Sequence, residues 1–104
     1  LNVQATELHW TEIPYSIWQD LPFSIGIEAT DKNGNRDTSC HSTLTLSVAN
    51  GDGTLSSSDG LSHTLQNCFL KWDNLQYSGN NSVRLKASDD AGILPSVVSK
   101  TIVV

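Results

Sequence analysis

The stretch Phe23-Ser24-Ile25-Gly26-Ile27-Glu28-Ala29-Thr30 alternates apolar residues with small or polar ones. Successive side chains of a β-strand point to opposite faces, so the apolar residues of this stretch share one face. The sequence Asp31-Lys32-Asn33-Gly34-Asn35 follows directly. It predicts a turn, because Asn-Gly tolerates positive φ. The stretch is therefore typical of a half-buried strand that ends in a tight turn.

The same alternation recurs along most of the chain, and no segment shows an apolar stripe with helical periodicity longer than two turns. We expect strands over residues 5–10, 23–30, 41–48, 68–73, 82–88 and 98–104, with a short further strand at Thr54-Leu55 or at residues 63–66. In the last strand, the pattern predicts that Val98, Ile102 and Val104 point inward. About seven antiparallel strands with frequent turns indicate an all-β, immunoglobulin-like two-sheet sandwich. An open barrel is the alternative.

Size and charge narrow the function classes. A chain of 104 residues is expected to form one domain, residues 1–104. The net charge is -5 and the six Lys and Arg residues are scattered, which disfavours nucleic acid and anionic membranes as partners. No apolar run approaches the ~18 residues of a membrane span. The chain contains no Met, and we interpret it as a domain cut from a longer protein.

Cys40 and Cys68 are the two cysteines of the chain. An even count in a small β-domain predicts a disulfide and an oxidising compartment, with two buried free thiols as the alternative. If one strand separates the two cysteine-bearing strands, both cysteines lie at the same end of the sandwich and point inward. The bond would close a loop of about 28 residues and contribute roughly 3–4 kcal/mol.

The string from Leu21 to Asn35 resembles the bacterial immunoglobulin-like domains of surface proteins of the invasin and intimin type. The pattern there is Pro-Phe, an alternating strand and then Ala-x-Asp-x-x-Gly-Asn. In this chain the matching residues are Pro22, Phe23, Ala29, Asp31, Gly34 and Asn35.

Two later strings extend this resemblance, residues 69–79 and residues 100–104. Trp72 stands where the family often has Phe, and Cys68 replaces a residue that is often Gly. The resemblance implies a non-catalytic module of a larger exported or cell-surface protein, which acts as a spacer or adhesive unit. It carries over no ligand-binding residue.

The loop after the quoted strand places oxygen-bearing side chains at alternate positions, namely Asp31, Asn33, Asn35 and Asp37. Calcium favours such loops, but an EF-hand needs Gly at position six and Glu at position twelve. Here Gly34 is fourth and Ser42 is twelfth. We interpret the loop as a hairpin turn in which Asp31 caps local amides, and keep a calcium site as the alternative. No other cofactor is expected.

Trp10, Tyr15 and Trp18 lie close together in the sequence near the first expected strand. Exposed aromatic rings would stack on sugars or anchor a protein partner. The alternative interpretation is that Trp10 fills the core and Trp18 covers one open end of the sandwich.

Nothing in the sequence indicates catalysis. His9, His41 and His63 are widely spaced, and no Gly-x-Ser-x-Gly elbow is present. The sequence therefore predicts an extracellular or cell-surface module that is not an enzyme. Its expected partners are neighbouring domains, with a host or cell-surface protein or a glycan as further candidates. The alternative is an accessory carbohydrate-binding domain of a secreted enzyme, which would use Trp18, Tyr15 and Trp10.

Overall fold

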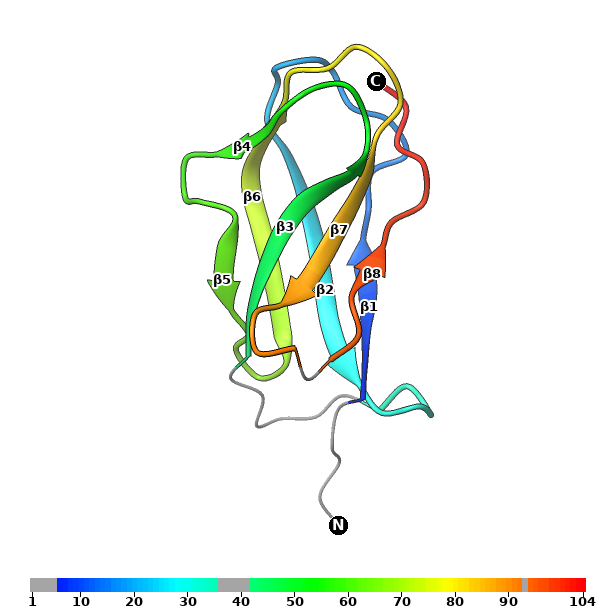
Figure 1. Cartoon of the computed structure of the whole chain (residues 1–104), viewed down its shortest axis with the longest axis vertical. Coiled ribbons are helices and arrows are strands. Elements are labelled where there is room, and N and C mark those ends of the chain that lie inside the picture. The colour runs from blue at the N-terminus through cyan, green and yellow to red at the C-terminus, as the bar shows by residue number, and fades with distance from the viewer. Residues whose placement is uncertain (1–5, 36–41, 93) are drawn as a thin grey trace.

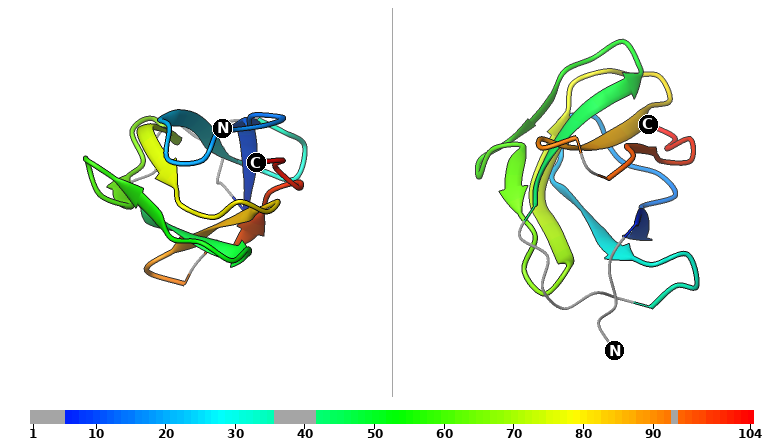
Figure 2. Two further views of the ribbon diagram at one scale, coloured as in Figure 1. Left: turned by 90° about the horizontal axis from the view of Figure 1, so that it is seen from above. Right: turned by 60° about the horizontal axis from the view of Figure 1, so that its bottom comes forward.

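The computed structural model describes residues 6–35, 42–92 and 94–104. These residues form two four-stranded antiparallel sheets that pack face to face (Figures 1 and 2). The predicted all-β sandwich is confirmed. The strands are β1 (Glu7–Glu12), β2 (Phe23–Thr30), β3 (Thr43–Asn50), β4 (Leu55–Ser57), β5 (Ser62–Thr64), β6 (Phe69–Tyr77), β7 (Arg84–Asp89) and β8 (Val97–Val98).

One edge of the sandwich is built by a segment that changes sheets. The sheet orders are β1-β2-β6-β4 and β5-β3-β7-β8. Between Leu55 and Thr64 the chain first pairs with β6 as β4 and then with β3 as β5. Both positions considered for the short fourth strand are therefore occupied, and the described residues form eight strands rather than about seven. β3 and β6 run in the same direction (Figure 1), but the predicted single strand between them is wrong: two short strands intervene, and each runs antiparallel to its partner.

The core lies between the two sheets and is filled mainly by inward side chains of β2, β3, β6 and β7. Trp72 of β6 is among the largest fully buried side chains, and its ring meets that of His63 edge-on at 5.9 Å between centroids. The strands contribute Ile25, Ile27 and Ala29 from β2, Leu44 and Leu46 from β3, Leu75 and Tyr77 from β6, and Leu85 and Ala87 from β7.

A β-bulge keeps both halves of β6 facing the core. Ile25 lies opposite Trp72, yet Phe23 lies opposite Leu75, so β6 has one extra residue there. Asn74 adopts a left-handed conformation with φ of 59° within this bulge. The extra residue changes the inward positions from even numbers to odd ones, which buries Leu75 and Tyr77 together with Trp72. The expected strand at 68–73 therefore continues to Tyr77.

The C-terminal strand differs from its prediction. Only Val97 and Val98 form β8, and Val98 is 47% exposed, so its predicted inward position is wrong. Ser99 is buried instead, and its hydroxyl accepts a hydrogen bond from the Leu85 N–H at 3.0 Å. A register shift after Ser99 then turns Ile102 inward, where it pairs with Val83. A bulge of this kind breaks the simple alternation that the sequence pattern assumed.

The bulge gives a prediction for Asn74. Asn74→Val places a β-branched residue at positive φ and should destabilise the domain by about 1–2 kcal/mol. Gln76→Val, an exposed position on the same strand, is the control and should change the free energy of unfolding by less than about 0.5 kcal/mol. Urea unfolding measures both variants. Equal stability of the two variants would contradict the assigned bulge.

Candidate functional site

The connection between β1 and β2 is held firmly at the end of the molecule where the C-terminus lies (Figure 1). The Ile17 side chain is buried, and its N–H donates to the Val103 carbonyl oxygen at 2.8 Å. The Asp20 N–H donates to the Tyr77 carbonyl oxygen at 2.9 Å, and the Gln19 side-chain amide donates to the Ser78 carbonyl oxygen at 2.7 Å. These bonds fix the loop between Ile17 and Asp20 against β6 and the end of the chain.

Two aromatic side chains project into solvent from this fixed connection. Tyr15 is 79% exposed and Trp18 is 78% exposed. The Lys100 ammonium lies 5.6 Å from the centroid of the Tyr15 ring, within the range of a cation–π contact. Trp18 is therefore not buried over the open end of the sandwich, as one interpretation of the sequence had it. Both rings stand on an ordered loop and are accessible for contact with a ligand or partner.

Trp10 occupies a different environment from the other two aromatic residues. It is half-buried and packs against the core, and its indole N–H is buried without a hydrogen-bond partner. The ring also lines an open hollow of about 330 Å³ together with Thr11, Ile13 and Lys100. Lys100 thus borders both this hollow and the Tyr15 ring. The sequence carried no signal for Lys100, because the fold alone brings it to Tyr15.

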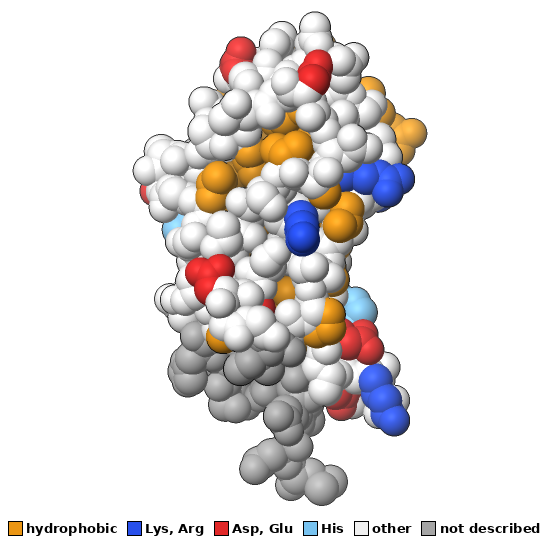
Figure 3. Space-filling model, viewed as in Figure 1, with side chains coloured by type: hydrophobic (Ala, Val, Ile, Leu, Met, Phe, Trp, Pro, Cys, Tyr) orange, Lys and Arg blue, Asp and Glu red, His pale blue; other side chains and the backbone are white. Residues whose placement is uncertain are grey.

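A metal centre or a further hollow would be another kind of site in the described part of the chain. Within residues 6–35, 42–92 and 94–104, no group of three or more His, Cys, Asp or Glu side chains could hold a metal ion. A second hollow, of about 380 Å³, is lined by Gln66, Asn67, Phe69, Leu70 and Lys71. On the face that carries β3 and β7, the Lys and Arg side chains lie apart from one another (Figure 3).

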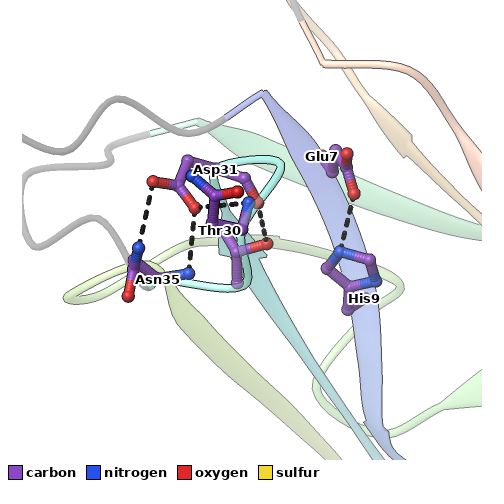
Figure 4. A network of polar contacts seen from close by, with 6 residues as sticks. Glu7, His9, Thr30, Asp31 and Asn35 are labelled. Atoms are coloured by element: carbon purple, nitrogen blue, oxygen red, sulfur yellow. Dashed lines mark hydrogen bonds and ion pairs between the residues drawn. The ribbon is translucent and has the colours of Figure 1, made fainter.

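Asp31 organises the turn after β2 (Figure 4). Its Oδ1 accepts hydrogen bonds from the N–H groups of Asn33 and Asn35 at 2.9 and 3.0 Å, and its Oδ2 accepts one from the Asn35 side-chain amide at 3.3 Å. The Asn35 N–H is the main cause that lowers the pKa of Asp31. Gly34 has φ of 86°, as the Asn-Gly sequence predicts. A turn in which Asp31 caps local amides is confirmed, but the predicted hairpin is wrong, because β2 pairs with β1 and β6 whereas β3 lies in the other sheet.

The calcium alternative at this turn stays a prediction. Asp37, one of its four proposed ligands, lies outside the described residues. Near the turn, His9 and Glu7 of β1 make an exposed side-chain contact with 2.8 Å between Nε2 and Oε2 (Figure 4).

Cys68 occupies an unusual backbone position at the start of β6. It is fully buried and has φ of 60°, beside Asn67 with φ of 52°. The Gln66 and Phe69 backbones close this tight turn with two hydrogen bonds of 3.0 Å. A glycine would adopt positive φ without strain, so Cys68 stands where the backbone itself favours Gly. No cysteine of the described residues is a free thiol. Cys40 lies outside those residues, so the Cys40–Cys68 disulfide stays a prediction.

The disulfide prediction is tested with thiol chemistry and stability. The unfolded, unreduced protein should show no titratable thiol. Reduction should lower the free energy of unfolding by about 3–4 kcal/mol. Cys68→Ala should match the reduced protein and show no further response to reductant. Two titratable thiols in the unreduced protein would contradict the pairing.

Comparison with known proteins identifies the fold. No protein-family model and no curated protein sequence matches this chain. A β-glucuronidase of Parabacteroides merdae matches in structure with a TM-score of 0.66 and 18% identity, over 92% of this chain and 12% of the enzyme. A conjugative transposon lipoprotein of Bacteroides eggerthii matches with a TM-score of 0.55 and 13% identity, over 92% of this chain and 94% of the lipoprotein.

These likenesses concern the β-sandwich fold. This chain spans about one-eighth of the length of the β-glucuronidase and almost the whole lipoprotein. Among the described residues, no helix is long and apolar enough to cross a membrane. The resemblance to invasin- and intimin-type domains stays a prediction. What the comparisons establish is that this chain has a β-sandwich fold that occurs both as a small part of a large enzyme and as a chain of similar size.

Proposed function

We propose that this domain is a non-catalytic module of an exported or cell-surface protein, which spaces or presents the neighbouring parts of that protein. The observation that carries the proposal is the placement of the two ends. β1 starts toward one end of the long axis, and the C-terminus lies at the other (Figure 1). The principal extents are 46 × 24 × 20 Å, and the two ends lie toward opposite poles of the longest one, so parts attached to them are held apart.

One further observation, one untested prediction and the sequence resemblance support an exported module. One structural neighbour is a lipoprotein of nearly the same extent as this chain. The predicted disulfide requires an oxidising compartment. The resemblance to invasin- and intimin-type repeats suggests the same role, with neighbouring domains and surface proteins as partners.

Replacement of the domain within its full-length protein tests the spacer role. A foreign β-sandwich of similar length, with its ends also at opposite poles, should restore the function of a protein from which this domain has been deleted. A foreign sandwich whose ends lie at the same pole is the matched control and should not restore it. Failure of both replacements would contradict the spacer role and indicate that the surface of this domain is needed.

The second candidate is an accessory carbohydrate-binding domain of a secreted enzyme. It is favoured by Tyr15 and Trp18, whose rings are exposed on a loop that is already fixed by hydrogen bonds. A fixed loop loses little conformational entropy on binding, and the apolar faces of sugars stack on aromatic rings. The match to a small part of a β-glucuronidase is consistent with an accessory role beside a catalytic domain.

A glycan array and a polysaccharide pull-down test this candidate. If it is correct, Trp18→Ala and Tyr15→Ala should each weaken binding by about tenfold or more, because central aromatic residues dominate binding energy. Val98→Ala removes an exposed apolar side chain on another element and should leave binding unchanged. A folded wild-type domain that binds no glycan would contradict this candidate and leave the spacer role in place.

A further inference from the structure

The inference rests on the proposed spacer function and concerns tensile load between the two ends of the domain. The connection after β1 and the last residues of the chain lie side by side in parallel, with a bridge between Ser16 and Val103. The Ile17 N–H donates to the Val103 carbonyl oxygen at 2.8 Å, and the Val103 N–H donates to the Tyr15 carbonyl oxygen at 3.2 Å. Among the strand pairs and isolated bridges of the described residues, this contact is parallel and the others are antiparallel.

The C-terminal segment is also held on its other side. The Ile102 N–H donates to the Val83 carbonyl oxygen at 2.8 Å, and the Val83 N–H donates to the Ile102 carbonyl oxygen at 2.9 Å. Residues 102–103 therefore lie between the 15–17 segment and the start of β7, with hydrogen bonds to each.

The direction of the chain decides how these bonds are loaded. β1 and the C-terminal segment run the same way along the long axis (Figure 1). Tension between the chain ends pulls the 15–17 segment toward the start of β1 and pulls residues 102–103 in the opposite direction. The strands are then sheared along their length, so the hydrogen bonds that join them carry the load together rather than one after another.

Two buried side chains strengthen this contact. Ile17 is 7% exposed and Ile102 is fully buried, and both belong to the hydrophobic core. Sliding the two segments past each other would withdraw these side chains from the core as well as break hydrogen bonds. At the other end, β1 is held to β2 by antiparallel pairing from Glu7 to Glu12.

We propose that residues 15–17 and 102–103 form a shear clamp, through which this domain resists tension applied between its two ends. The clamp gives the spacer a specific mechanical role, since a module that joins parts of a surface protein has to stay folded when those parts are pulled apart. The clamp would bear tension that is applied along the polypeptide chain.

Single-molecule force spectroscopy on the domain, held within a full chain or between handles at its two ends, tests the clamp. Ile17→Ala removes a core side chain from the clamp, whereas Leu55→Ala removes one of similar burial, 6% exposed, from β4. Both variants should melt at lower temperature than the wild type. At constant force, only Ile17→Ala should unfold about tenfold or more faster, because the lost contacts are those broken at the mechanical barrier.

A second measurement needs no core substitution. The wild-type domain is pulled either from its two ends or from its N-terminal end and a handle ligated at the exposed turn around Gly60. The second geometry takes residues 102–103 out of the load path and should give faster unfolding at the same force. Equal rates for the two geometries, or equal acceleration by Ile17→Ala and Leu55→Ala, would overturn the clamp. Either result leaves the replacement test of the spacer role untouched, so the two proposals fail separately.

Discussion

The bulge at Asn74 in β6 is the constraint on which most of this structure depends. β6 lies inside its sheet between β2 and β4, and it has to bury Trp72, Leu75 and Tyr77 on one face. Strict alternation would put Trp72 and Leu75 on opposite faces, which would leave one large side chain in water. The left-handed residue at Asn74 removes that conflict, and Asn is among the residues that adopt this conformation at low cost.

The end of β6 then positions the candidate binding loop. The buried Tyr77 offers its carbonyl oxygen to the Asp20 N–H and its hydroxyl to the Gly53 N–H at 2.8 Å. Gly53 lies so close to the Gly79 backbone that a Cβ would collide with it, which explains the glycines in these two loops. The loop that carries Trp18 is therefore fixed through β6, and its exposed ring stands on a rigid base. Packing in the core and geometry at the surface are linked through one residue, because the Tyr77 side chain is buried and its carbonyl oxygen holds the Trp18 loop.

The sequence was enough to predict the fold class, but it predicted less well which side chains are exposed at the surface. Period-two alternation located β2, β3 and β7 well, because each runs without a bulge through its buried part. It failed at Val98, where the Ser99 hydroxyl replaces a regular ladder contact and shifts the register. It also left Trp18 open between core and surface, because burial of a loop residue depends on distant partners such as Val103 and Tyr77. The approach of Lys100 to Tyr15 and the 15–17 contact with Val103 have no local signal at all.

The spacer role proposed for this domain depends on a rigid frame and on the placement of its ends at opposite poles. The most direct measurement is the distribution of distances between spin labels placed just before β1 and after Val104 in the full-length protein, recorded by pulsed electron resonance. A single narrow distribution near the length of the domain is the predicted result. A broad distribution, or a short distance that brings the two labels to the same pole, would contradict it.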